Sequence, residues 1–224
     1  RVKAYEIGFK SDFLDKRVRL NVAAFYNKYQ NIILIDTNGY PGACLPTAVP
    51  LCSNPDPHFF FLSAVPFNAG NADVKGLEFE TTIEPVEGLI FRGSLSYLDF
   101  KYTSLAADAV SSGVGINNKA PYTPSWNWSV DVSYKIPFQN GASVTPRFYA
   151  DYTGSYYALP ENKPTDYIPG RTMLNANITY TSANSDWEFV AGVTNLTDKH
   201  YFFAAFDNTS NNVSKSAGQW LAGI

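Results

Sequence analysis

The feature that most constrains the fold of this chain is a strict alternation of apolar and polar residues. From Trp126 to Ile136 every even-numbered residue is apolar and every odd-numbered residue is polar, and the stretches 74–84 and 144–153 alternate in the same way. Successive side chains of a β-strand point to opposite faces, so this pattern predicts strands with one apolar and one polar face. A helix would need apolar residues three and four positions apart, and no long stretch has them. The chain is therefore predicted to be all-β.

The predicted strands are long. Nine are expected, and most span about 11 to 15 residues, against ~5–6 residues for a usual strand. A strand that crosses a membrane needs about 9–11 residues for the hydrocarbon alone, so this length favours a transmembrane sheet over a soluble sandwich. The predicted ranges are 4–11, 16–30, 73–85, 88–103, 123–137, 142–154, 170–181, 186–197 and 217–224.

The connections between these strands alternate in length. Short turns are predicted at 11–15, 85–88, 138–141 and 182–185, and long linkers at 31–72, 104–122, 155–169 and 198–216. Short periplasmic turns and long extracellular loops are typical of outer-membrane barrels. The pattern therefore predicts a transmembrane antiparallel up-and-down β-barrel in the cell outer membrane.

Aromatic residues gather near both ends of the predicted apolar faces, as expected of two interfacial belts. Near the outer ends are Tyr26, Tyr97, Trp126, Trp128 and Tyr152, and near the inner ends are Phe9, Phe91, Tyr134, Tyr180 and Trp187. The polar face is expected to line the lumen, where its charges pair with one another or hold whatever fills the lumen. It carries Glu78, Glu80, Glu84, Arg92, Ser94, Ser96, Asp131, Lys135, Arg147, Asp151, Asn175, Asn177 and Glu188.

The composition excludes several other classes of protein. Of the 224 residues 17% are charged and 16% are aromatic, and the formal net charge is −3; these values argue against disorder and against a basic nucleic-acid-binding surface. No run approaches the ~18 apolar residues of a spanning helix. The only histidines are His58 and His200, and nothing places a serine beside them for a Ser–His–Asp site. No enzymatic activity, cofactor or bound metal is expected.

Two candidate features lie in the long linkers. Cys44 and Cys52 are expected to form a disulfide that closes a short loop, with free thiols as the alternative, because their spacing with Asp56 and His58 fits no standard zinc pattern. Aromatic side chains in these linkers are candidate extracellular ligand contacts, although they could equally pack the loops together. These candidates are Phe59, Phe60, Phe61, Tyr156 and Tyr157.

The number of strands also bears on completeness. Bacterial single-chain barrels have an even number of strands and no free edge, and nine strands cannot close in that way. Residues 1–224 are therefore expected to be the C-terminal portion of a larger barrel.

Four segments, in order along the chain, resemble motifs of the TonB-dependent outer-membrane receptors. Residues 68–80, Asn-Ala-Gly-Asn-Ala-Asp-Val-Lys-Gly-Leu-Glu-Phe-Glu, resemble the family's N-A-G-x-A-x-x-x-G-x-E-x-E strand. Residues 5–11 and 20–29 resemble the preceding hairpin, residues 120–124 a proline segment that opens a later strand, and residues 193–201 the N-L-T/F-D-K-x-Y motif near the C-terminus.

This resemblance implies more than the residues themselves. It implies a 22-stranded barrel with a plugged lumen, an N-terminal plug, and a segment that engages the energy-coupling protein TonB, neither of which lies within residues 1–224. It also implies outer-membrane lipid or lipopolysaccharide around the barrel and uptake of a scarce large solute, most often a ferric siderophore. A passive porin would show the same alternation, and a soluble β-sandwich adhesin or lectin is the more distant alternative.

Overall fold

The computed structural model describes residues 1–36, 65–206 and 219–223. One antiparallel sheet of nine strands contains most of them, and its order is β1-β2-β3-β4-β5-β7-β10-β11, with β6 paired to β7. Apart from β6, the strands of this sheet therefore lie side by side in the order in which they occur in the chain. The strands are β1 (Val2–Phe13), β2 (Val18–Asp36), β3 (Val65–Val86), β4 (Leu89–Leu105), β5 (Trp126–Tyr134), β6 (Ile136–Pro137), β7 (Ser143–Thr153), β10 (Arg171–Thr181) and β11 (Glu188–Val193).

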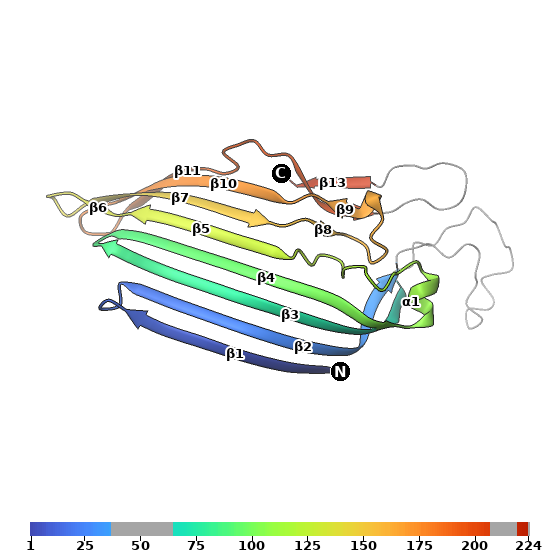
Figure 1. Ribbon diagram of the computed structural model, residues 1–224. Helices are drawn as coiled ribbons and strands as arrows, with labels where there is room; N and C mark the ends of the chain where they lie inside the picture. Colours follow the sequence, from blue (N-terminus) through green and yellow to red (C-terminus); the bar gives the residue numbers. More distant parts are fainter. Residues whose placement is uncertain (37–64, 207–218, 224) are drawn as a thin grey trace.

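The connections of the sheet are sorted onto two ends. The β3–β4 turn and β6 lie at one end, whereas the helix α1 (Ala107–Ser111) and the short strands β8 (Tyr156–Tyr157) and β9 (Tyr167–Ile168) lie at the other (Figure 1). The predicted all-β class and the up-and-down order are thus confirmed. The described part of the chain has no helix with the length and hydropathy that a membrane span requires.

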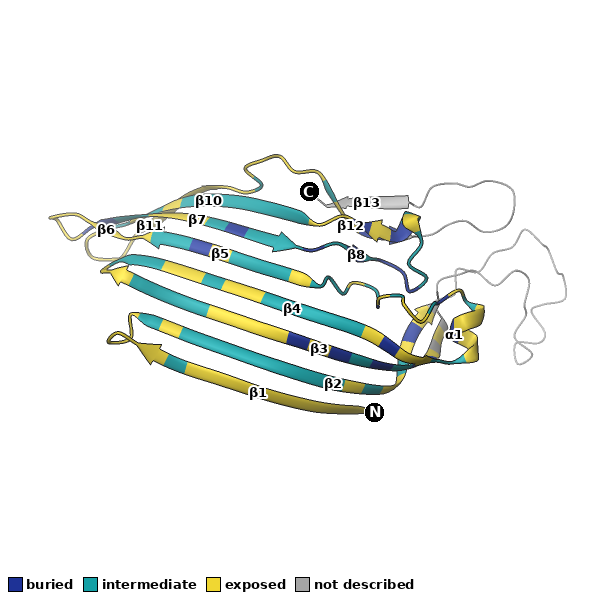
Figure 2. Cartoon of the chain, in the orientation of Figure 1, coloured by how far each residue is buried: buried dark blue, intermediate teal, exposed yellow. Residues whose placement is uncertain are grey.

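One face of the sheet is apolar and exposed. Large apolar side chains on this face have exposed fractions from 36% for Tyr180 to 76% for Ile7, and exposed residues extend along nearly all of β1 (Figure 2). A soluble sandwich would bury such a face in a core. The set comprises Tyr5, Ile7, Phe9, Leu77, Phe79, Phe91, Leu95, Trp126, Val130, Tyr134, Phe148, Ile178, Tyr180, Phe189 and Val193.

Aromatic rings on this face meet across neighbouring strands. The ring centroids of Tyr97 and Trp126 are 4.6 Å apart, and those of Trp128 and Tyr152 are 5.7 Å apart and stacked. Tyr5 stacks on Tyr26 in the same way at 6.3 Å. Such cross-strand aromatic pairs stabilise a sheet and fix its register. The outer belt predicted from the sequence is therefore a row of packed rings.

The largest buried cluster covers the loop end of β2, β3 and β4. Ala109 of α1 and Val114 are buried against Leu34, Ala69 and Tyr102. Small residues on β3 allow the helix to lie close to the strands. The helix was not predicted, because five residues are too few to show a helical period.

The structure has a strand where the sequence predicted only the linker 198–216. β12 (Tyr201–Phe206) pairs with β13 (Gln219–Gly223) as a separate two-stranded sheet. The bend before it is held by Asn195, whose side chain accepts a hydrogen bond from the N–H of Lys199 at 2.8 Å and donates one to the carbonyl of Lys199 at 3.2 Å. Residues 201–206 are almost uniformly apolar, so they show no alternation to reveal the strand.

Two other predicted boundaries were wrong. β2 continues to Asp36 and β3 begins at Val65, so the predicted linker 31–72 is shorter at both ends. The register shifts between Tyr29 and Ile32, and Asn31 adopts a left-handed φ of 57°. This irregularity breaks the period-two pattern there, although the strand pairing continues.

The packing of the Phe25 ring over β3 requires a glycine at position 76. Phe25 lies directly opposite Gly76, and its ring occupies the space beside the glycine. A Cβ at position 76 would also lie 2.7 Å from the carbonyl oxygen of Tyr97, closer than real Cβ atoms come to backbone. The glycine therefore allows Phe25 to fold back over β3.

The substitution Gly76→Ala is expected to destabilise the sheet by about 1–3 kcal/mol, because overpacking forces neighbours off their preferred positions. The urea midpoint of the refolded receptor would measure the change. Gly93→Ala is the matched control, since its Cβ would meet nothing closer than 3.5 Å. Equal midpoints for the two variants would contradict this account.

Candidate functional site

The second face of the sheet carries the polar side chains predicted to line a lumen. The registers align them in rows: Asn21 lies opposite Glu80, Glu80 opposite Ser94, and Ser94 opposite Ser129, which faces Asp151. The hydroxyl oxygens of Ser94 and Ser129 are 2.7 Å apart. The polar face is thus continuous from β2 to β7.

An open groove of about 440 Å³ lies on this polar face. Carboxylates and hydroxyls of four strands line it, so the groove offers mainly hydrogen-bond acceptors. It suits a positively charged or donor-rich group. The polar lining residues are Glu78, Glu80, Ser94, Ser96, Asn127, Ser129, Tyr149, Asp151 and Thr153.

Nearer the turn end, one carboxylate holds two arginines. Asp131 accepts a hydrogen bond from Nη1 of Arg92 at 3.0 Å and another from Nε of Arg147. Its side chain is only 6% exposed, whereas both arginines are about half exposed. A buried carboxylate needs such pairing to offset the loss of its water. The three groups together carry one positive charge on the polar face.

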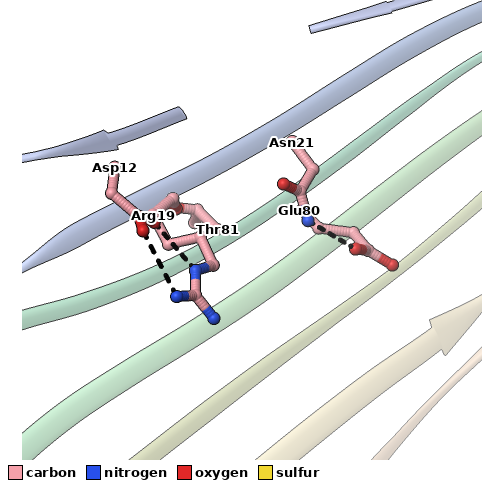
Figure 3. Close-up of polar contacts among 5 residues, drawn as sticks. All are labelled: Asp12, Arg19, Asn21, Glu80 and Thr81. Carbon is pink, nitrogen blue, oxygen red and sulfur yellow. Dashed lines mark hydrogen bonds and ion pairs between the residues drawn. The ribbon is translucent and has the colours of Figure 1, made fainter. Parts of the chain in front are cut away.

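The β1–β2–β3 part of the polar face is also hydrogen-bonded (Figure 3). Nε and Nη2 of Arg19 donate to the two carboxylate oxygens of Asp12 at 2.8 and 3.3 Å. Nδ2 of Asn21 donates to Oε2 of Glu80 at 3.2 Å, and from the apolar face Oγ1 of Thr81 donates to the backbone carbonyl of Arg19 at 3.0 Å. The Arg19 guanidinium meets Asp12 with the two-pronged geometry that fixes orientation.

At the loop end, two connecting segments are joined by hydrogen bonds. Asn162 accepts from the N–H of Lys119 at 2.7 Å and donates to the carbonyl of Lys119 at 3.0 Å. Asn118 donates to the carbonyl of Pro160 at 2.9 Å. The segments 106–125 and 154–170 therefore form one unit, here named the rim.

Tyr156 and Tyr157 both lie in the rim, but in different surroundings. Tyr156 is 7% exposed, belongs to a buried cluster with Ile168 and Ala205, and donates its hydroxyl to the carbonyl of Phe203 at 3.1 Å. Tyr157 is partly exposed, and its ring meets that of Tyr167 at 5.5 Å. Tyr156 thus holds β8 in place, whereas Tyr157 faces partly outward.

Two further rim tyrosines were not identified from the sequence. Tyr122 is 52% exposed, lies 5.6 Å from the ring of Tyr156, and donates its N–H to the carbonyl of Tyr157 at 2.9 Å. Partial burial raises the pKa of the Tyr122 phenol, and the Tyr156 phenol adds to the rise. Tyr167 is brought to Tyr157 only by the β8–β9 pairing, which the sequence does not reveal.

The remaining candidates lie outside the described residues. These are Cys44 and Cys52, the Asp56–His58 pair, and the aromatic triplet Phe59, Phe60 and Phe61. Their predicted disulfide and ligand contacts stay predictions. Among the residues that the structure describes, no group of three or more His, Cys, Asp or Glu side chains gathers as metal ligands would.

The substitution Asp131→Asn is expected to lower the stability of the folded receptor by about 1–3 kcal/mol, because it leaves Arg92 and Arg147 without their shared, charged hydrogen-bond partner. The midpoint of urea unfolding of the purified receptor would measure the loss. Asp151→Asn is the matched control: it makes the same change of charge on the same face, at a carboxylate without an ion pair among the described residues. A smaller loss for Asp131→Asn than for Asp151→Asn would contradict the role of the arginine pair.

Comparisons with known proteins agree with this geometry. Residues 1–196 match the family model described as TonB dependent receptor-like, beta-barrel. The probable TonB-dependent siderophore receptor PiuA of Acinetobacter baumannii is 23% identical over 210 residues, which are 91% of this chain and 24% of that protein. The matched region is therefore almost all of this chain.

Solved structures show the same fold. The ferric yersiniabactin uptake receptor FyuA from Yersinia pestis superposes with a TM-score of 0.70 at 17% identity, over 99% of this chain and 28% of that one. The siderophore receptor PiuA from Acinetobacter baumannii gives a TM-score of 0.65 at 20% identity, over 99% and 26%. The chain spans about a quarter of the length of these relatives. It belongs to the TonB-dependent receptor-like β-barrel family.

Proposed function

We propose that the protein containing this chain is an outer-membrane receptor that takes up a ferric siderophore with energy supplied through TonB. The observation that carries the proposal is the family match over residues 1–196 together with an exposed apolar face opposite a polar one. An apolar face of this extent is stable where lipid covers it. In this proposal residues 1–224 form the C-terminal portion of a 22-stranded barrel.

The polar face and the rim support different parts of this function. The polar face carries a groove of carboxylates and hydroxyls beside an arginine pair, and such mixed charges suit contacts with a plug that fills the lumen. The rim presents tyrosines with aromatic rings and hydroxyl donors, which suit a polar aromatic chelate. The coupling to TonB is proposed to run through an N-terminal segment of the whole protein.

The proposal also explains why energy coupling would be needed. A scarce ligand must be bound tightly to be captured, and tight binding makes release slow. The outer membrane holds no nucleotide pool, so the work of release comes from the inner membrane through a mechanical partner. A passive porin would need no such partner.

Uptake of labelled ferric siderophores in iron-limited cells tests this function. Deletion of the gene is expected to reduce uptake of one siderophore to background, and the intact gene on a plasmid is expected to restore it. Uptake is further expected to stop when an uncoupler removes the proton gradient. Uptake that persists with the uncoupler and rises in proportion to solute concentration would instead indicate a porin.

The rim tyrosines give a second, more local test. In the full receptor, Tyr157→Ala and Tyr122→Ala are each expected to weaken binding of the transported siderophore roughly tenfold, about 1.4 kcal/mol, through loss of ring contact. Tyr157→Phe keeps the ring and is expected to bind much as the unaltered receptor does. Equilibrium binding to purified, folded receptor would measure the effect. If all three variants bound the siderophore as tightly as the unaltered receptor does, the rim would be excluded as a contact surface.

A further inference from the structure

An open pocket of about 190 Å³ lies on the polar face, between β7 and β10. Four side chains line it, two from each strand. Arg147 lies directly opposite Asn177, and Tyr149 lies directly opposite Asn175. The pocket is distinct from the groove of carboxylates, with which it shares only Tyr149. We name it the donor pocket, after the N–H and O–H groups that its four residues carry.

The side chains of the donor pocket carry more hydrogen-bond donors than the sheet uses. Arg147 uses Nε for the ion pair described above, and within the described part of the chain its two Nη atoms have no hydrogen-bond partner. The same is true there of the hydroxyl of Tyr149 and the amide of Asn177. Asn175 accepts the N–H of Asn195 at 2.9 Å through Oδ1, which leaves its Nδ2 hydrogens available.

A glycine keeps one wall of the donor pocket clear. Gly192 of β11 lies directly opposite Asn177. A Cβ at position 192 would come within 3.0 Å of the Cβ of Asn177, tighter than most real Cβ contacts. Any larger residue would therefore crowd the Asn177 side chain, and the glycine leaves it room to meet a partner.

The charge around the donor pocket suits an anion. Asp131 lies between Arg92 and Arg147, and the three groups together carry one positive charge. The Arg147 side chain is 48% exposed, so its Nη atoms are accessible from the polar face. A guanidinium offers paired N–H bonds that match the two oxygens of a carboxylate. Asp151, two residues beyond Tyr149 on β7, belongs to the groove, about 7 Å along the strand at ~3.4 Å per residue.

We propose that the donor pocket binds a carboxylate side chain of the plug. This inference rests on the proposed function, in which a plug fills the lumen that the polar face lines. The aspartate or glutamate of the plug would accept N–H bonds from the Nη atoms of Arg147, while Nε of the same guanidinium keeps its bond to Asp131. Once the plug covers the pocket, water is excluded and such charge-assisted hydrogen bonds strengthen. One arginine would then join the plug to the β5–β7 pair.

Zero-length cross-linking of the purified full receptor tests the inference. Asn177→Lys places an amine in the donor pocket, and a water-soluble carbodiimide activates carboxyl groups. The amine attacks the activated carboxyl carbon and forms an amide bond, and the carbodiimide leaves as a urea that takes up one carboxyl oxygen. Mass spectrometry of a digest is expected to find residue 177 joined to an aspartate or glutamate of the plug. Ser129→Lys, the matched control in the groove, is expected to join to its neighbour Asp151 instead.

A second pair of variants measures the strength of the contact. Asn177→Asp places a like charge beside the plug carboxylate and is expected to raise the equilibrium constant for release of the plug about tenfold. Asn127→Asp makes the same change on the polar face, among the groove residues, and is expected not to raise it. A dye on a plug cysteine would follow release of the plug in a urea titration, and circular dichroism would follow the barrel.

The lack of any cross-link between residue 177 and the plug would overturn the inference, and so would equal release of the plug in the two aspartate variants. Uptake by the unaltered receptor separates this result from the proposed function. A receptor that takes up ferric siderophore only while the proton gradient is present, but shows neither effect at the plug, would leave the proposed function intact and refute only the donor pocket.

Discussion

The separation of the two faces depends on a register that does not slip. Side chains alternate with a period of two, so a shift of one residue in any strand pair would turn its apolar set into the polar face. In β2–β3 the pairing is regular from Val18 opposite Ile83 to Tyr29 opposite Ala72, and its shifts occur only beyond Tyr29. Contacts on the polar face hold the registers of the sheet. Phe25 fits only over Gly76, and Arg92 lies directly opposite Asp131.

The sheet could be predicted from the sequence because period two survives wherever one face differs from the other. The long alternation of 126–136 and 144–153 corresponds closely to β5 (Trp126–Tyr134) and β7 (Ser143–Thr153). The loop end could not be predicted, since its structure depends on contacts between distant segments. The β8–β9 pair and the Asn162–Lys119 contact join residues that no local pattern connects. For the same reason the sequence identified Tyr157 as a candidate but not Tyr167, although their rings touch.

Both faces of the sheet contain cations placed close to one another, and they are balanced differently. On the polar face, Asp131 lies between Arg92 and Arg147 and is almost fully buried, so the sheet supplies the counter-charge itself. On the apolar face, Lys3 and Lys28 lie opposite each other with only partial compensation. Hydrogen-bonded ion pairs within the protein, such as those of Asp131, hold neighbouring strands together. Exposed charges with only partial compensation interact with what surrounds the protein, and the strength of that interaction varies with ionic strength.

The joining of the two rim segments has a consequence for changing what such a receptor recognises. Asn162 is hydrogen-bonded to both the N–H and the carbonyl of Lys119, and Asn118 reaches the carbonyl of Pro160. A loop held in this way loses little conformational entropy when it meets a ligand. It also cannot be exchanged alone, because a foreign 154–170 segment would leave the backbone of Lys119 and the side chain of Asn118 without these partners. Loop grafting between receptors of this kind would have to transfer both segments as one cassette.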